Sequence, residues 1–101
     1  MKSMLHKEGS TARLRLSGRL EWDTVSLFNR AAAAALGDAS VREVIIDFSE
    51  IEFVDSIALG GLLSYREKCE KAGKALRLSN YAAPVRKAFI TANFHKLFRL
   101  D

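Results

Sequence analysis

The strongest constraint on the fold is the segment Val41–Phe48, whose apolar residues Val44, Ile45, Ile46 and Phe48 lead through a short acidic loop into an apolar helix. Such a concentration of apolar residues is typical of a central strand that is covered on both faces. Helical spacing continues over Ile57–Ala72, where Lys68 and Lys71 lie in the last turns and Gly73 follows the end. The sequence therefore predicts a buried strand that delivers its loop to the start of a helix.

Strand patterns also occur on either side of this unit. Thr11–Ser17 alternates apolar and polar residues, as a half-buried strand does, and Gly18 is expected to end it. Met4–Lys7 is expected to form a short strand before it, with a turn between the two. Further along the chain, Ala75–Ser79 predicts another strand and Leu97–Leu100 predicts a final edge strand.

Two more helices are expected around these strands. The first has Asp23 or Thr24 as its N-cap, because either side chain can accept a hydrogen bond from a free amide of the first turn. Gly37 is expected to end this helix in a left-handed conformation. The other helix begins near Pro84, which has no amide hydrogen to leave unpaired, and ends near Asn93. Apolar residues at helical spacing support both: Val25, Phe28, Ala32 and Leu36 in the first, and Val85, Ala88, Phe89 and Ala92 in the second.

The order of these elements predicts the fold class. Strand, strand, helix, strand, helix, strand, helix and strand follow one another along the chain. Alternation of this kind is typical of an α/β domain with a mixed sheet, here of four to five strands packed with about three helices. A chain of 101 residues is long enough for one such domain.

Composition restricts the function classes. The net charge is +4, but the Lys and Arg residues are scattered, which favours a solvated surface over a direct nucleic-acid interface. The longest apolar stretches fall far short of the roughly 20 residues that span a bilayer, so no membrane insertion is expected. A single cysteine and no signal peptide predict a cytoplasmic location. Cys69 is expected in the core, and Trp22 is expected to pack as a staple on the start of the first helix.

Ser56 is the most informative polar residue, because it lies where the loop after the buried strand meets the helix. Free amides and aligned peptide dipoles at a helix start favour negative charge, so a phosphate on this hydroxyl would be stabilised. From the residue types alone, a helix cap by Asp55 or Ser56 is the simpler explanation. Ser49 and Ser64 are alternative hydroxyls, and an exposed helix position explains Ser64 more simply.

The segment around Ser56 also resembles a known family. Asp55-Ser56 and Leu59-Gly60, which follow an apolar strand and Phe53-Val54, resemble the STAS domain, the fold of anti-sigma factor antagonists. The resemblance implies a single STAS domain over residues 1–101, with a core over about residues 4–100. Weaker similarities occur in Gly18-Arg19-Leu20, Pro84-Val85-Arg86 and Phe94–Phe98.

The resemblance implies that Ser56 is phosphorylated and dephosphorylated to switch partners. The unmodified chain would bind a serine kinase that is also the anti-sigma factor, phosphorylation would release it, and a serine phosphatase would reset the chain. The chain departs from many members in Ile57-Ala58, where they have a small residue and then glycine. This departure leaves phosphorylation of Ser56 open. The expected partner-binding residues are Asp23, Phe53, Asp55, Ser56, Ile57, Leu59 and Gly60.

Other functions remain as alternatives. Stand-alone STAS proteins also resemble the small cytoplasmic subunit of bacterial lipid-transport ABC complexes, which binds the ATPase and needs no turnover at Ser56. An enzyme such as a small hydrolase is a third alternative. No base is placed near Ser56, and the sequence has neither a phosphate-binding glycine loop nor metal-ligand spacing. A binding module without catalysis, cofactor or metal is therefore expected.

Two further pairs of residues allow more than one interpretation. Gly60 and Gly61 lie inside the expected helix, where each glycine costs roughly 0.5–1 kcal/mol relative to alanine. They indicate either tight packing or a bare helix face that a partner can approach. Asp47 and Asp23 could form a carboxylate pair for acid–base chemistry. Capping and solubility are the simpler roles, because no histidine is placed to help.

Overall fold

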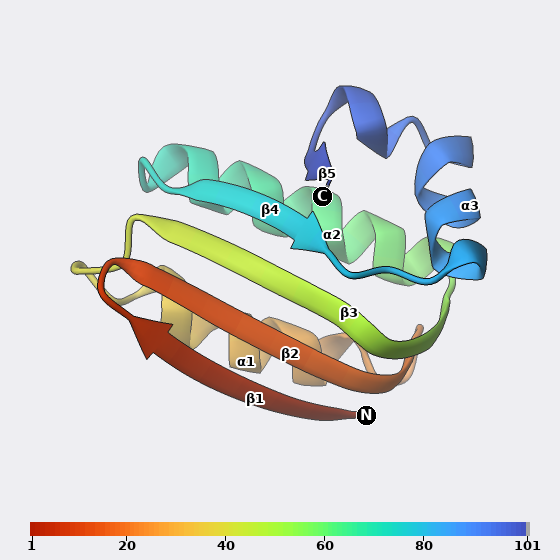
Figure 1. Cartoon of the computed structure of the whole chain (residues 1–101), viewed down its shortest axis with the longest axis horizontal. Helices are drawn as coiled ribbons and strands as arrows, with labels where there is room; N and C mark the ends of the chain where they lie inside the picture. The colour runs from red at the N-terminus through yellow and green to blue at the C-terminus, as the bar shows by residue number, and fades with distance from the viewer. Residues whose placement is uncertain (101) are drawn as a thin grey trace.

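The computed structural model describes residues 1–100 and contains a mixed sheet of five strands. The strands lie in the order β1-β2-β3-β4-β5, so neighbours in sequence are neighbours in the sheet. Only β1 runs antiparallel to its neighbour β2, and the other pairs are parallel. The predicted α/β fold with a mixed sheet is therefore confirmed (Figure 1). The strands are β1 (Lys2–Glu8), β2 (Thr11–Leu20), β3 (Glu43–Val54), β4 (Ala75–Ser79) and β5 (Arg99–Leu100).

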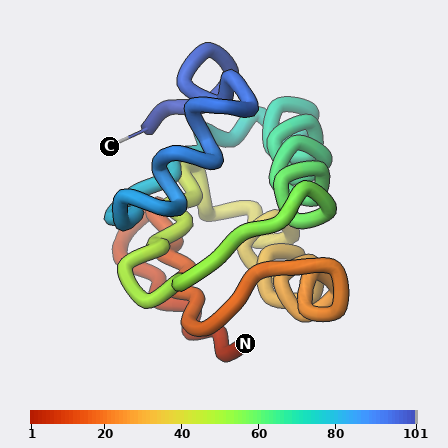
Figure 2. Tube along the Cα trace, turned by 90° about the vertical axis from the view of Figure 1, so that its right-hand side faces the viewer, coloured from red at the N-terminus to blue at the C-terminus, as the bar shows by residue number. Residues whose placement is uncertain are grey.

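Two helices, α1 (Val25–Leu36) and α2 (Ser56–Lys71), cover one face of the sheet (Figure 2). They pack through an edge-to-face contact between the rings of Phe28 and Tyr65, whose centroids are 5.7 Å apart. The Tyr65 hydroxyl donates a hydrogen bond of 2.9 Å to a backbone carbonyl of α1. Cys69 of α2 is buried in the core, as predicted, and burial raises the pKa of its thiol.

A third helix, α3 (Ala83–Thr91), is followed by a 3-10 turn, η1 (Phe94–Lys96). Both are held by aromatic packing against the central strand. Phe89 makes an edge-to-face contact with Phe48 of β3 and stacks on Phe94, which in turn stacks on Phe98. This cluster fixes α3 beside the C-terminal end of β3, where the chain enters α2.

The structure corrects the predicted role of Gly18. The strand does not end there but continues to Leu20, with a register shift in its pairing to β3. Gly18 has φ +98, a left-handed conformation that glycine adopts without steric cost, as is common at a β-bulge. The bulge allows β2 to continue as far as the end of β3, and it places Arg19 opposite Phe53.

The ends of α1 also differ from the prediction. Gly37 follows α1 with φ −80, so the expected left-handed end is absent. Thr24 occupies the N-cap position without a side-chain hydrogen bond to the helix, and Asp23 does not cap it either. The Thr24 hydroxyl instead donates to the Arg19 carbonyl at 2.8 Å and accepts from the Glu21 amide at 2.9 Å. It therefore stabilises the turn that precedes the helix.

Asp47 lies buried on the sheet face opposite α1 and α2, where two arginines of β2 bind its carboxylate. Its Oδ2 is 3.1 Å from Nη1 of Arg13 and 3.7 Å from Nε of Arg15, and its Oδ1 accepts from the Ser49 amide at 2.9 Å. Burial alone would raise the pKa of Asp47, but hydrogen bonds from Ser49, Asn80 and Arg13 outweigh it and hold the pKa below its usual value. The Asp47 carboxylate is thus paired with the two arginines, whereas Asp23 is exposed in the loop before α1. The contacts of Asp47 are those of a structural ion pair, the simpler kind of role expected from the sequence.

The lowered pKa of Asp47 makes stability depend on pH. A carboxyl group with a depressed pKa contributes stability that is present above its unfolded pKa of about 3.9 and is lost as the pH falls through its folded pKa. We expect Asp47→Asn to lower the free energy of unfolding by about 1–3 kcal/mol at neutral pH. The difference from wild type should shrink below about pH 4. Urea titrations of wild type and Asp47→Asn from neutral pH to below about pH 4 measure this difference. A difference in the free energy of unfolding that does not change with pH would contradict the prediction.

Candidate functional site

The junction between β3 and α2 is organised by Asp55. Its Oδ1 accepts a hydrogen bond of 2.8 Å from the Ala58 amide, which makes Asp55 the N-cap of α2. Its Oδ2 accepts a bond of 2.9 Å from the Trp22 amide, in the loop that enters α1. One carboxylate therefore holds together the two loops that lead into the helices, which run side by side at this end of the molecule (Figure 2).

Ser56 is the first residue of α2, and its side chain is exposed. The first amides of a helix have no partner within the helix. Here the Asp55 side chain takes the amide of Ala58, and the Asp55 carbonyl takes that of Leu59 at 3.0 Å. The amides of Ser56 and Ile57 are left for solvent or for a bound anion. Because Asp55 supplies the cap, the Ser56 hydroxyl is not needed to stabilise the helix start.

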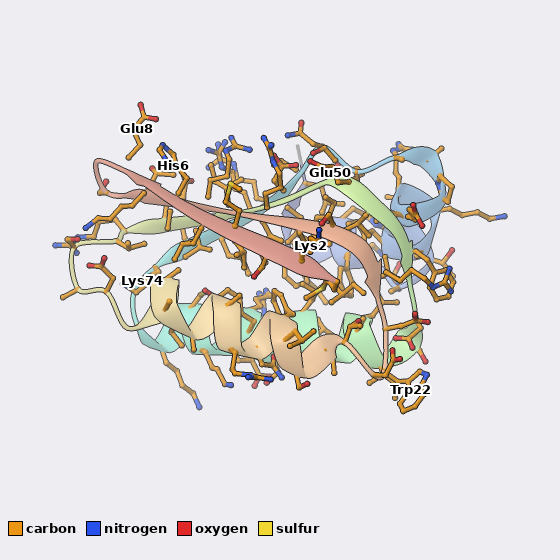
Figure 3. All side chains as sticks on the ribbon, turned by 90° about the horizontal axis from the view of Figure 1, so that it is seen from below. Lys2, His6, Glu8, Trp22, Glu50 and Lys74 are labelled. Carbon is orange, nitrogen blue, oxygen red and sulfur yellow. The ribbon has the colours of Figure 1, made fainter. Side chains whose placement is uncertain are left out.

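Exposed apolar side chains lie on the segments that meet at this junction. The exposed fractions are 69% for Trp22, 39% for Phe53 and 56% for Ile57. We call these three residues the apolar rim. Trp22 projects into solvent near the start of α1 (Figure 3), so the prediction that it packs as a staple is wrong. Large apolar side chains exposed around one polar group are typical of a surface that contacts another protein.

Charge is arranged around Phe53 of the rim. The guanidinium of Arg19 lies over the Phe53 ring, 4.4 Å from its centroid, in a cation–π contact. Nε of Arg19 also donates to Oε2 of Glu21 at 2.9 Å, and this hydrogen bond raises the pKa of Arg19. Arg19 therefore contacts both the Phe53 ring and the Glu21 carboxylate.

A hollow of about 460 Å³ lies beside the rim, between the end of β3 and α3. Phe53 and Leu59 line one side, and α3 supplies the other with Pro84, Lys87 and Thr91. Phe53 and Leu59 are among the contact residues that the sequence predicts, whereas the residues of α3 are not. No local pattern marks those residues, because their position depends on aromatic packing between distant segments.

The two glycines of α2 have different surroundings. A Cβ added at Gly60 meets nothing within 4 Å, so this glycine leaves a bare, exposed helix face. A Cβ added at Gly61 would lie 2.7 Å from Cγ2 of Val25 in α1. Each of the two interpretations therefore describes one of the glycines. Gly60 leaves a bare helix face, and Gly61 allows tight packing, which is against α1.

The other predicted positions make no hydrogen bond to Asp55 among those that organise the junction. Asp23 is exposed in the loop before α1, and Ser64 is exposed two turns along α2. Ser49 is exposed on β3, and its amide donates to Asp47. Within residues 1–100, His, Cys, Asp and Glu form no group of three or more that could hold a metal ion. No helix in the same range is long and apolar enough to cross a membrane.

Removal of the Asp55 carboxylate should destabilise the protein. Asp55→Ala deletes an N-cap and the bond to the Trp22 amide, so we expect the free energy of unfolding to fall by about 1–2 kcal/mol. Asp23→Ala is the matched control, since this carboxylate is exposed in the neighbouring loop and does not cap α1. Urea unfolding at neutral pH measures both. Equal stability of the two variants would contradict the bridging role.

Comparison with known proteins identifies the family of this fold. Residues 3–100 match the family model described as Mlab, STAS domain. A STAS-domain-containing protein of Pseudomonas aeruginosa (strain UCBPP-PA14) is 26% identical over 94 residues, which is 93% of this chain and 91% of that protein.

Solved structures of anti-sigma factor antagonists share the fold. The unphosphorylated form of SpoIIAA is 22% identical, covers 99% of this chain and 87% of its own, and superposes with a TM-score of 0.74. The phosphorylated form of the Bacillus protein gives the same identity and TM-score and covers 91% of its own chain. An antagonist from Mycobacterium paratuberculosis is 21% identical, covers 98% of this chain and 83% of its own, and has a TM-score of 0.87.

Proposed function

Because the chain belongs to the STAS domain family, we propose that it is an anti-sigma factor antagonist whose binding is switched by phosphorylation of Ser56. The observation that carries this proposal is the exposed Ser56 hydroxyl on the first turn of α2. Asp55 caps this helix, so the hydroxyl is free of that role. A similar fold has been solved as both an unphosphorylated and a phosphorylated protein, SpoIIAA. The fold is thus compatible with such a modification.

The switch follows from local electrostatics. A phosphate adds roughly 1.5 to 2 negative charges at neutral pH and three acceptor oxygens. The start of α2 tolerates this charge, because amides of the first turn point toward it. A partner surface that fits a neutral hydroxyl among the apolar rim does not tolerate it, because an unpaired charge buried at an interface costs several kcal/mol. Phosphorylation therefore leaves the domain folded and releases the partner.

The proposed contact surface comprises residues on both sides of the hydroxyl. Ile57 and Phe53 supply apolar area, Asp55 adds a like charge beside the phosphate, and Gly60 lets a partner backbone approach α2 closely. Leu59 in the hollow and Asp23 at the entrance to α1 extend this surface. The bound protein is an anti-sigma factor that is also a serine kinase, and a serine phosphatase resets Ser56. In this role the chain is a cytoplasmic binder and a substrate, not a catalyst.

A second candidate function is that of a permanent subunit that binds the ATPase of a lipid-transport ABC complex. The exposure of Ile57 favours it, because an apolar side chain beside the hydroxyl contributes to binding without any phosphate. The same face of α2 would serve in both cases. The two functions differ in whether a charge at Ser56 matters.

A pull-down from lysate of the native host distinguishes them. The baits are wild type, Ser56→Ala and Ser56→Asp, and mass spectrometry identifies the retained proteins. A small serine kinase that is held by the first two baits and lost with the third supports partner switching. An ABC-type ATPase that is held by all three supports the transport subunit and leaves Ser56 without a regulatory role.

A further inference from the structure

The outer side of β1 is the long free edge of the sheet. All seven residues of β1 are exposed, and β2 pairs with one side of the strand only. The opposite edge of the sheet, β5, has two residues and is a poor template for another strand. A strand edge with unpaired backbone groups can pair with a further strand unless charges, bulges or proline prevent it.

From this edge we propose that a second copy of the chain pairs with the first through β1, antiparallel, about a two-fold axis at Leu5. A two-fold dimer uses the same surface on both copies, so the sequence of β1 must be complementary to itself. Centring the axis on Leu5 satisfies this condition along the whole strand. It places Leu5 opposite Leu5, Met4 opposite His6, Ser3 opposite Lys7, and Lys2 opposite Glu8.

The charges at the two ends of β1 suit this register. Lys2 of one copy meets Glu8 of the other, and the symmetry repeats the pair, so the dimer gains two cross-strand ion pairs. Inside one chain the residues opposite them on β2 are uncharged, Ser17 and Thr11. Glu8 lies 3.8 Å from His6 of its own strand, and both project on the sheet face away from α1 (Figure 3).

The middle of the strand has no charge that would repel a second copy. Met4 and Leu5 are exposed there and are covered by residues of the partner strand in this register. Edge strands are often protected by lysine. Of the two lysines of this edge, Lys2 faces Glu8 of the other copy in this register, and Lys7 is turned back onto its own chain, where its Nζ contacts Ser40 and lies 3.2 Å from Asp38.

The expected dimer is weak and depends on concentration. One pair of seven-residue strands is a small contact compared with the about 1,200 Å² or more that stable interfaces bury, so we expect a weak association. It uses no residue of the Ser56 junction, so it stands or falls independently of the proposed partner switching.

Charge reversal along β1 tests the pairing by sedimentation velocity from micromolar to millimolar concentration. Lys2→Glu and Glu8→Lys each put like charges opposite one another, and we expect each to weaken dimerisation by about tenfold. The double variant restores the opposite charges, so it should dimerise as wild type does. Circular dichroism confirms that all four proteins are folded. A wild type that stays monomeric at millimolar concentration, single variants that dimerise as wild type does, or a double variant that is not restored would each overturn the proposal.

Discussion

Ser56→Asp is expected to bind the anti-sigma factor at least tenfold more weakly than wild type, whereas Ser56→Ala should bind within a few-fold of it. A carboxylate at this position adds a charge among exposed apolar side chains, and each 1.4 kcal/mol of desolvation cost lowers affinity tenfold. Alanine keeps the surface neutral and small. Titration calorimetry with the purified partner measures all three affinities.

Ser64→Asp is the matched control for this experiment. It introduces the same charge on the same helix at another exposed serine, two turns from the junction. Its binding should stay within a few-fold of wild type. If Ser56→Asp and Ser56→Ala bound equally well, charge at the junction would not control binding, and the phosphorylation switch would be wrong.

Gly61→Val should destabilise the protein by about 1–3 kcal/mol more than Gly60→Val. Both variants replace a glycine of α2 by the same residue, so their helix propensities cancel. They differ in space, because a Cβ at Gly61 lies 2.7 Å from Val25 while one at Gly60 meets nothing within 4 Å. Val25 cannot move aside freely, since β-branched side chains in helices keep essentially one rotamer. Urea unfolding of both variants measures the difference.

A second substitution isolates the cause of this loss. Val25→Ala removes the methyl group that the new side chain would meet, so the combination with Gly61→Val should recover part of the lost stability. Additive losses in the double variant would show that the contact between α1 and α2 is not responsible. The same Gly60→Val variant also tests binding, because it covers the bare face of α2 near Ser56.

The parts of the fold that depend on local pattern could be predicted from the sequence. Ala75–Ser79 was predicted with the bounds that the structure shows, and the buried strand and the second helix follow directly from their apolar spacing. The predicted end of β2 at Gly18 is wrong, because the strand continues to Leu20. A glycine in a strand pattern marks either an end or a bulge, and pairing with β3 decides between them.

The candidate site was predictable only where it lies on one stretch of chain. Asp55, Ser56 and Ile57 follow one another in sequence, so the strand–loop–helix pattern placed them together. Other parts of the site depend on contacts between distant segments. These parts are the exposed position of Trp22 and the side of the hollow that α3 lines. No spacing within a single segment encodes such contacts. The residues missed were therefore those on the far side of the junction.

The double role of Asp55 has a consequence for transplanting this loop. The loop does not keep its structure by itself, because the Asp55 carboxylate that caps α2 also binds the Trp22 amide, 33 positions earlier in the chain. Moving Val54–Gly60 alone onto another scaffold would leave the Trp22 anchor behind and free the carboxylate to turn away. A working graft must carry two discontinuous pieces, the serine loop and the entry turn of the first helix, in their mutual geometry.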